Sequence, residues 1–583
     1  MTDLSFDRRS VLRTGGMGLA GLGLSGLLPA WAQSGTAGLG AGAQVLSGED
    51  IHLRIGHSRF ATGGRTGHAV TVNGVLPAPL LRLREGQQVR LHVHNDLAED
   101  SSIHWHGLLV PFQMDGVPGV SFPGIPARAS FTYEFPVIQS GTYWYHSHSG
   151  LQEQLGHYGP IVIDPAGADP VAHDREHVIV LSDWTFMHPH KLFVRMKQEG
   201  GFFNRQKETL LGRRDRTLSA ADRAMFAQMR MDPSDISDVT GAAYTYLVNG
   251  HGPQENWTGL FRPGERVRLR IINAGAQTIF NLRIPGLAMT VIAADGLPVR
   301  PVTVDEFQIG NAETYDVIVE PAEDRAYTLV AEAIDRSGMA RATLAPRLGM
   351  VAPVPPLRKR PTLTMKDMGM GGMDHGAGGA SGEHAGHGAA SASTAADHGS
   401  MDMRDETKVP FDAGVGVDMI APAPVDRTGD RPLGLENEPH RVLTYRDLMA
   451  RDANPDPRQP TRAISVHLTG NMERFMWSID GKRFSENPEP IRFARNERVR
   501  VTMVNHSMMT HPMHLHGHFF EVVNGHTGHH PRKHTVMVLP GGTLTFDLTA
   551  DAPGDWAFHC HMLYHMHAGM MRVVTVRPLE GEA

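Results

Sequence analysis

The sequence is almost free of cysteine, and Cys560 is the only one in 583 residues. A single thiol cannot form a disulfide within the chain, which excludes a disulfide-stabilised scaffold. The sequence also has no excess of basic residues, because 55 Lys and Arg stand against 62 Asp and Glu and the formal charge is −7. A mildly acidic chain is not suited to bind nucleic acid, so nucleic acid is not an expected partner.

The N-terminal leader lacks the length of apolar sequence that a stable membrane span needs. Arg8 and Arg9 precede a Gly-, Leu- and Ala-rich run that ends at Leu28, and a small-residue cleavage motif ends at Ala32. Residues 1–32 therefore resemble a twin-arginine export signal. We expect the twin-arginine translocation machinery to deliver the protein to the periplasm, with no stable membrane insertion after cleavage. An uncleaved anchor is the alternative.

The body of the chain contains three related β-units. In each unit a turn residue (Gly86, Gly264 or Asn496) stands three positions before a valine and nine before an asparagine. Turn chemistry followed by an alternating β-rich run is typical of a loop that enters a strand of a β-sandwich. The repeat predicts an all-β protein.

The second unit lacks the histidines that the other two share. His-x-His pairs occur at equivalent distances from the repeat in units 1 and 3, whereas unit 2 has Leu282-Arg283-Ile284 at one of these places. Alternate strand positions project from one face, so eight imidazoles suit a cluster of three copper ions between units 1 and 3. His92 and His94 have no counterpart in the other units, and we interpret them as strand-face histidines. The four equivalent pairs are His104/His106, His146/His148, His514/His516 and His559/His561.

Cys560 lies between the two histidines of the last pair. Alternation predicts a strand from Gly554 to His561, which sends His559 and His561 to one face and Cys560 to the other. Two metal sites can therefore share three consecutive residues. The alternative interpretation is a buried cysteine among unrelated histidines.

A thiolate, two imidazoles and a weak thioether form a blue-copper electron-transfer centre. Cys560, His565 and Met570 supply three of these four ligands within one short stretch. His511, three residues before a His-x-His pair, can turn towards the neighbouring site and supply the second imidazole. Met571 is the alternative thioether, but on a strand it would point the other way.

Two stretches stand apart from the β-units. An insertion from about Asp183 to Asp238 has helical character, with a capping box at Ser219 to Asp222. Its methionines are interpreted as core residues, with Cu(I) binding as the alternative. Met365 to Met403 has no Leu, Ile, Val or aromatic residue but six Met and four His, so we expect a disordered segment that captures additional Cu(I). A passive linker is the alternative.

Several long motifs resemble those of the multicopper oxidases, and most closely their periplasmic copper-resistance branch. The resemblance extends from about Leu46 to Val576 and implies three tandem cupredoxin-like Greek-key β-sandwich domains at residues 44–165, 170–345 and 441–583, with a linker at 346–440. The motifs that carry it include His104-Trp105-His106-Gly107, Gly141-Thr142-Tyr143-Trp144-Tyr145-His146-Ser147-His148-Ser149-Gly150 and Thr510-His511-Pro512-Met513-His514-Leu515-His516-Gly517.

The resemblance implies four copper ions and dioxygen as the electron acceptor. It also implies a catalytic acid at Asp115, beside the type 2 copper, and electron transfer through Cys560. Many relatives have an acidic residue directly after the second type 1 histidine, where this chain has Met566. The ligand sets that it implies are His104 and His514 for type 2; His106, His146, His148, His516, His559 and His561 for the type 3 pair; and His511, Cys560, His565 and Met570 for type 1.

Three functions are compatible with these motifs. The first is oxidation of Cu(I) in copper resistance, the second is oxidation of phenols as in a laccase, and the third is copper sequestration without catalysis. A complete ligand set argues against sequestration, because storage does not need Cys560 joined to paired histidines. The methionines near the type 1 ligands and the Met/His segment favour Cu(I) as the substrate.

Overall fold

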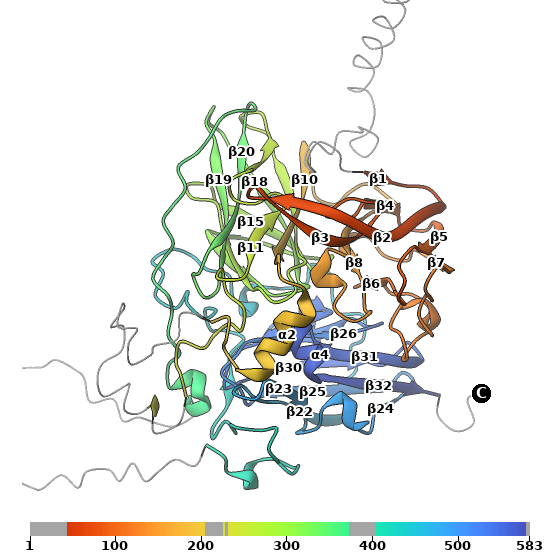
Figure 1. Ribbon diagram of the computed structural model, residues 1–583, viewed down its shortest axis with the longest axis vertical. Helices are drawn as coiled ribbons and strands as arrows, with labels where there is room; N and C mark the ends of the chain where they lie inside the picture. The colour runs from red at the N-terminus through yellow and green to blue at the C-terminus, as the bar shows by residue number, and fades with distance from the viewer. Residues whose placement is uncertain (1–43, 205–225, 228–230, 372–402, 579–583) are drawn as a thin grey trace, which may run out of the picture.

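The computed structural model describes residues 44–204, 226–227, 231–371 and 403–578, and β-strands are its main secondary structure (Figure 1). The strands form six sheets in the described part of the chain, two in each of three successive units. This confirms the predicted all-β class with cupredoxin-like sandwiches. The short helices are α2 (Pro189–Gln198), α4 (Leu563–Ala568), η2 (Phe112–Met114), η3 (Glu153–Leu155), η4 (Lys366–Met370), η5 (Glu406–Lys408), η6 (Tyr445–Asp447) and η7 (Phe484–Glu486).

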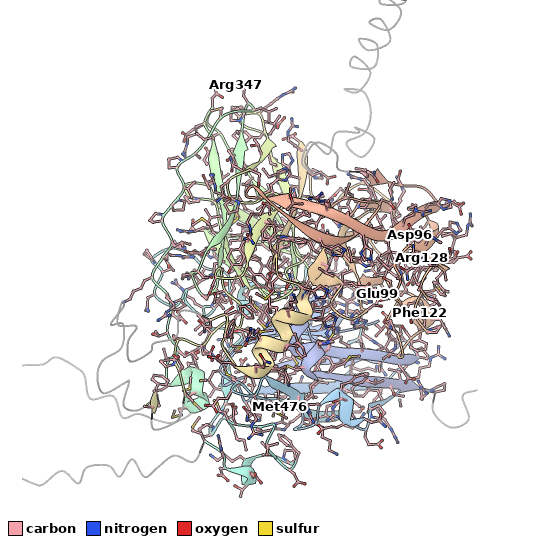
Figure 2. The ribbon with its side chains drawn as sticks, viewed as in Figure 1. Asp96, Glu99, Phe122, Arg128, Arg347 and Met476 are labelled. Atoms are coloured by element: carbon pink, nitrogen blue, oxygen red, sulfur yellow. The ribbon has the colours of Figure 1, made fainter. Side chains whose placement is uncertain are left out.

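Unit 1 packs two sheets around a core that includes Leu53, Trp105, Phe122 and Ile161, and Phe122 is labelled in Figure 2. One sheet has the order β1 (Val45–Leu46), β4 (Leu80–Arg84), β9 (Tyr158–Asp164), β8 (Gly141–His146) and β6 (His104–His106). The other has the order β3 (Arg65–Val72), β2 (Asp50–Thr62), β5 (Gln88–Asn95) and β7 (Ser130–Pro136).

Unit 2 repeats this plan of two packed sheets. One sheet has the order β11 (Thr245–Val248), β10 (Arg175–Trp184), β13 (Val267–Asn273), β18 (Thr314–Val319), β15 (Met289–Ala294) and β16 (Leu297–Val304). The other has the order β12 (Trp257–Leu260), β20 (Met339–Ala345), β19 (Tyr327–Ala333), β14 (Phe280–Arg283) and β17 (Glu306–Ile309).

Unit 3 contains the chain's C-terminal strands. One sheet has the order β23 (Met476–Ile479), β22 (Arg462–Asn471), β25 (Arg498–Asn505), β30 (Gly542–Thr549), β27 (Phe520–Val522) and β28 (Arg532–Lys533), with β21 (Val425–Asp426) paired to β30. The other has the order β24 (Ile491–Ala494), β32 (Met571–Arg577), β31 (Gly554–Cys560), β26 (His511–Leu515) and β29 (Thr535–Val538).

The sequence repeat corresponds to a repeated strand with its preceding turn. The three turn residues have left-handed φ values of 90°, 88° and 62° and stand two or three positions before the first residues of β5, β13 and β25. The asparagine that ends each of these strands accepts a hydrogen bond from the backbone N–H two residues later and donates through its Nδ2 to nearby carbonyls. The repeat therefore encodes both ends of the same strand. These asparagines are Asn95, Asn273 and Asn505.

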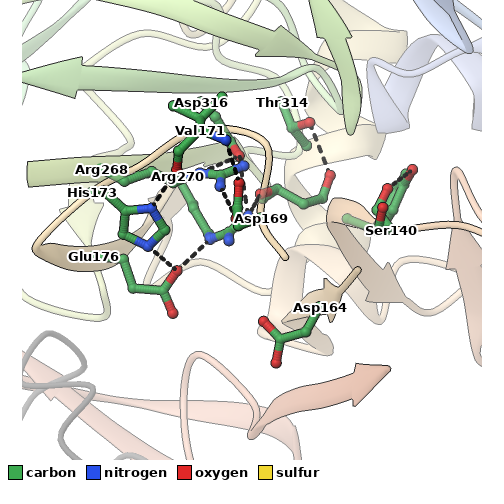
Figure 3. Close-up of polar contacts among 12 residues, drawn as sticks. Ser140, Asp164, Asp169, Val171, His173, Glu176, Arg268, Arg270, Thr314 and Asp316 are labelled. Carbon is green, nitrogen blue, oxygen red and sulfur yellow. Dashed lines mark hydrogen bonds and ion pairs between the residues drawn. The ribbon is translucent and has the colours of Figure 1, made fainter. Parts of the chain in front are cut away.

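Unit 2 holds strand β8 of unit 1 through buried polar contacts, shown in Figure 3. The Arg270 guanidinium donates to Thr142 Oγ1 at 3.0 Å and to Asp316 Oδ2 at 3.1 Å. The Thr314 hydroxyl donates to the Thr142 carbonyl oxygen at 3.1 Å. Because β8 ends at His146, these contacts position a predicted metal ligand from a unit that carries none.

Parts of the insertion and linker are folded more tightly than the sequence indicates. Met368, Met370 and Met403 are buried in the main core, so the predicted disorder of Met365 to Met403 is wrong for these flanks. The flexible methionine side chain can fill an irregular gap in the core. These three residues therefore pack against ordered segments although the stretch has no Leu, Ile or Val. Residues 372–402 lie outside the described part of the chain.

The predicted helical character of the insertion is confirmed by α2, which begins after the N-cap residue His188. The helix buries Leu192 and Met196, so Met196 is a core residue as interpreted from the sequence. The capping box at Ser219 to Asp222 and the leader at residues 1–32 lie outside the described residues. Within the described ranges, no helix is long and apolar enough to cross a membrane.

Candidate metal centres

Eight histidines from units 1 and 3 meet in one buried group. They come from β6, β8, β26 and β31 and from the turns that follow these strands. The antiparallel pairing of β6 with β8, and of β26 with β31, places one His-x-His pair opposite another. Contacts cross the interface: His561 Nε2 lies 3.3 Å from His146 Nε2, and the ring centroids of His104 and His516 are 3.9 Å apart. The eight are His104, His106, His146, His148, His514, His516, His559 and His561.

Burial keeps seven of these imidazoles neutral, which is the form that binds metal. Loss of hydration, together with the neighbouring histidines, lowers the pKa of most of them well below the usual value, and burial lowers the pKa of His559 to about 4. The others with a strongly lowered pKa are His106, His146, His148, His514, His516 and His561.

The donor atoms of this group fit bound copper. Five of its ring nitrogens are buried and have no hydrogen-bond partner in the described protein. Orphaned polar atoms of this kind are costly inside a protein unless an ion or water satisfies them. Neutral imidazole is a suitable ligand for copper. The five atoms are His104 Nε2, His106 Nδ1, His148 Nε2, His514 Nε2 and His561 Nδ1.

Asp115 fixes two of the imidazoles from the outer side. Its backbone oxygen accepts from His104 Nδ1 at 2.7 Å, and its Oδ2 accepts from His516 Nδ1 at 2.9 Å. The turn packs closely, because a Cβ on Gly116 (φ 88°) would lie 1.9 Å from the Ile103 carbonyl oxygen. Asp115 therefore turns the opposite nitrogens of His104 and His516 towards the group.

Two further residues that sequence reasoning missed contact the group. Glu153 Oε2 lies 2.7 Å from His146 Nδ1, and burial, with Asp183 nearby, raises the pKa of Glu153. The backbone oxygen of His534 accepts from His514 Nδ1 at 2.7 Å, and the His534 ring lies 4.8 Å from that of His106. Neither belongs to a His-x-His pair or a repeated position, so no signal in a single sequence marks it.

Cys560 lies on the opposite side of β31, at the centre of a second group. Its Sγ is 3.6 Å from His511 Nδ1 and 3.8 Å from His565 Nδ1, and the two Nδ1 atoms are 3.3 Å apart. All three side chains are buried, and burial raises the pKa of the Cys560 thiol. A thiol and two imidazoles within this triangle fit the predicted blue-copper ligands, since metal binding stabilises the thiolate.

The outer nitrogen of each imidazole in this second group has its own partner. His511 Nε2 contacts Ser507 Oγ at 2.7 Å, and His565 Nε2 contacts Asp238 Oδ2 at 2.7 Å. Trp477 stacks on the His565 ring with the centroids 4.0 Å apart. These contacts orient both Nδ1 atoms towards Cys560 before any metal binds. Asp238 comes from the insertion in unit 2.

The two candidate thioethers lie in different environments. Met570 is fully buried in the same core cluster as Cys560, and its carbonyl oxygen accepts from the Cys560 N–H at 3.1 Å. Met571 pairs with His559 across β31 and β32 and packs in a separate cluster with Val117. Met570 lies directly before β32 and Met571 is the first residue of that strand, and their side chains enter different clusters.

The histidines of β5 lie outside both groups. His92 Nε2 is 3.1 Å from Asp50 Oδ1, and His94 Nε2 is 3.1 Å from Asp96 Oδ1, with both imidazoles partly exposed. They are strand-face histidines, as predicted from their lack of counterparts in the repeat. The groups of metal-ligating atoms found among the described residues instead include triplets within the eight-histidine group and the triplet around Cys560.

Three models of the multicopper oxidase family match the chain, at residues 55–168, 175–347 and 457–580. The chain belongs to the multicopper oxidase family. It is 46% identical to Copper resistance protein A of Escherichia coli, over 98% of this chain and 99% of that protein. It is 47% identical to the Copper resistance protein A homolog of Pseudomonas syringae pv. tomato, over 96% of both. The predicted resemblance is confirmed.

The multicopper oxidase fold is also evident in solved structures. Fet3p, described as a multicopper oxidase that functions in iron import, matches with a TM-score of 0.63 over 91% of this chain and 90% of that chain. At 18% identity this likeness shows the fold alone. Family membership implies an oxidoreductase with type 1, type 2 and type 3 copper and dioxygen as acceptor.

Proposed function

We propose that this multicopper oxidase oxidises Cu(I) to Cu(II) in copper resistance and passes the electrons to dioxygen. The relatives named for copper resistance support this, since they are nearly half identical over almost the full length. The twin-arginine motif in residues 1–32 supports a periplasmic location. The proposed domains are residues 44–165, 170–345 and 441–583.

We assign the twelve predicted ligands as the family resemblance implies. The eight-histidine group would hold the type 2 and type 3 ions, and His511, Cys560, His565 and Met570 would hold the type 1 ion. When bound, copper supplies the one-electron steps between the substrate and dioxygen. The observation that carries the assignment is the position of Cys560 between His559 and His561 at the end of β31, because it joins both groups covalently.

The chain's own residues would prepare both groups for this chemistry. Asp115, Ser507 and Asp238 each engage the outer nitrogen of an imidazole, so the inner nitrogen is free to bind metal. Dioxygen reduction also consumes protons. We propose that Asp115 is the acid beside the type 2 ion, since its Oδ1 lies 3.4 Å from His104 Nδ1 and has no hydrogen-bond partner among the described residues.

The test of this function is steady-state dioxygen consumption by copper-loaded protein, with Cu(I) and a phenol as separate substrates at matched free copper. We expect turnover with Cu(I) to exceed turnover with the phenol. Faster phenol turnover would favour the laccase alternative. Absence of turnover with either substrate, in protein that contains four copper ions, would favour sequestration.

A further inference from the structure

The long hairpin of β2 and β3 reaches from unit 1 onto unit 2 (Figure 1). The Thr62 hydroxyl donates to Glu255 Oε2 at 2.8 Å, and the Gly63 N–H donates to Glu255 Oε1 at 2.7 Å, so the turn of the hairpin is tied to unit 2. A Cβ on Gly67 would lie 2.9 Å from the Trp184 ring, which means that the hairpin packs closely against the end of β10. These contacts fix the position of the hairpin between the two units.

Two exposed histidines share one face of this hairpin. The antiparallel register sets His57 opposite Val70 and His68 opposite Arg59. His57 and His68 are therefore diagonal neighbours on adjacent strands, which is within reach of two imidazoles. The buried Ala69, next to His68, points to the other face. Both histidines lie outside the two histidine groups between units 1 and 3.

The ring nitrogens of the two histidines turn towards each other. His57 Nδ1 lies 3.0 Å from His68 Nε2, and the ring centroids are 4.7 Å apart with an angle of 49° between the ring planes. A metal ion about 2.0–2.1 Å from each nitrogen would subtend an angle of about 95° between them. This angle is close to the right angle of a square-planar site, which is a geometry of Cu(II), and is narrower than that of a tetrahedral site.

The histidines of β5, on the same sheet, lack this arrangement. His92 Nε2 lies 3.1 Å from Asp50 Oδ1, and His94 Nε2 lies 3.1 Å from Asp96 Oδ1. Hydroxyl groups of β7 contact the Nδ1 atoms of both rings. The protein therefore uses both nitrogens of each ring. In the described structure, the facing nitrogens of the hairpin pair contact each other instead.

The hairpin pair is available to a cation from solvent. Partial burial, and then the nearby imidazoles of His57 and His188, lower the pKa of His68, which favours its neutral, metal-binding form. We do not assign His188 as a ligand. Its Nδ1 accepts from the His190 N–H at the start of α2, so its neutral ring carries the proton on Nε2. Because the pair is exposed, water can fill the remaining positions around a bound ion.

We infer that His57 and His68 form an accessory binding site for a divalent copper ion, with His57 Nδ1 and His68 Nε2 as the protein ligands. Imidazole suits copper, and Cu(II) has the highest affinity of the first-row divalent metals for nitrogen sites. The fixed hairpin holds both rings close to their binding positions before the ion arrives. The inference goes beyond the proposed Cu(I) oxidation and does not depend on it, because binding Cu(II) requires no electron transfer.

The test titrates copper-loaded wild-type protein and the double variant His57→Gln/His68→Gln with Cu(II), followed by equilibrium dialysis and electron paramagnetic resonance. We expect the wild type to bind one more Cu(II) than the double variant, and the difference spectrum to show a tetragonal signal coupled to two nitrogens. Residues 372–402 are present in both proteins, so their histidines cancel in the difference. Each single variant should bind this ion about 100-fold more weakly, because it loses the second imidazole of a chelate. Dioxygen consumption should be unchanged.

The matched control is His94→Gln, which removes a partly exposed imidazole whose nitrogens Asp96 and Ser130 already engage. It should bind Cu(II) as the wild type does. Circular dichroism checks the fold, and the single variants carry the test if the double variant does not fold.

Equal Cu(II) binding by the wild type and the folded variants would overturn the site and leave a hydrogen bond between two surface histidines. The same loss of binding in His94→Gln as in the single variants would also overturn it, since any surface histidine would then serve. Tighter binding of Zn(II) than of Cu(II), measured by competition, would overturn the assignment to copper.

Discussion

The two histidine groups differ in how many units build them. The eight-histidine group takes four side chains from unit 1 and four from unit 3, whereas the Cys560 group takes its four proposed ligands from unit 3 alone. The Cys560 group can therefore form within one sandwich, while the other requires two sandwiches to dock correctly. Strand β31 carries residues of both groups. Its neighbouring residues His559 and Cys560 therefore belong to different groups.

Unit 2 contributes no proposed ligand but contacts the surroundings of both groups. Asp238 engages His565 in one group, and Asp295 accepts from the backbone N–H groups of His534 and Thr535 beside the other. Arg270 and Thr314 hold the strand that ends at His146. The comparison shows that the unit without ligands acts on both sites by positioning them.

The largest expected effect is that of Cys560→Ser. A serine oxygen cannot form the covalent copper–thiolate bond, so the blue absorbance and turnover should fall to background while the fold remains. Copper content and circular dichroism, measured beside the visible spectrum, should show the eight-histidine group still loaded. An intense blue band in this variant would exclude Cys560 as a type 1 ligand.

The reciprocal change is His104→Ala, with His514→Ala as its counterpart in unit 3. Either should stop dioxygen reduction but leave the blue absorbance, because these histidines belong to the other group. Visible and electron paramagnetic resonance spectra of copper-loaded protein separate the two centres. Loss of blue absorbance in a folded His104→Ala variant would contradict two separate centres.

A smaller effect is expected from Asp295→Asn, which tests the positioning role of unit 2. Asp295 Oδ1 lies 3.0 Å from the Nζ of buried Lys533, and Glu313 lies 3.1 Å from the same nitrogen. Glu313 still pairs with Lys533 in this variant, so the loss should be that of charged hydrogen bonds, about 2 kcal/mol of unfolding free energy. Turnover should fall about 10-fold to 100-fold, with a changed type 2 signal and an unchanged blue band.

The control for this change is Asp324→Asn, which removes an exposed ion pair with Arg347 in the same unit. Exposed pairs contribute about 0 to 1 kcal/mol, so stability and spectra should stay near the wild type. If Asp295→Asn alters the blue band as strongly as the type 2 signal, the effect on the fold is general and the positioning role is excluded.

The ligand constellation could be predicted from the sequence because its parts follow short periodic rules. The repeat aligned His104 with His514 and His146 with His559, and strand alternation separated Cys560 from His561. The positioning residues could not be predicted in this way. Glu153 and His534 reach the group through tertiary contacts between segments far apart in the chain, and a single sequence has no periodic signal for such contacts.

A moderate effect confined to the Cys560 group is expected from Asp238→Asn. The carboxylate holds His565 Nε2 at 2.7 Å and also accepts from Gln277 Nε2 at 2.9 Å. Weakening this contact should lower turnover about 10-fold and shift the reduction potential of the blue centre. The type 2 signal should not change. A change in that signal without a change in potential would contradict an effect through His565.

The smallest effect is expected from residues 372–402, which connect the buried Met370 to the buried Met403. A variant of equal length, with serine at every Met and His between these flanks, removes soft ligands without changing the length of the loop. If the segment captures Cu(I), it raises the effective copper concentration near the chain, so turnover should fall at limiting Cu(I) and recover at excess. Phenol turnover and unfolding free energy should stay unchanged. Equal loss of turnover with Cu(I) and with the phenol would indicate a linker role. No loss of turnover with either substrate would mean that the Met/His composition is not used in turnover. Both results would exclude the capture role but leave the two metal centres as proposed.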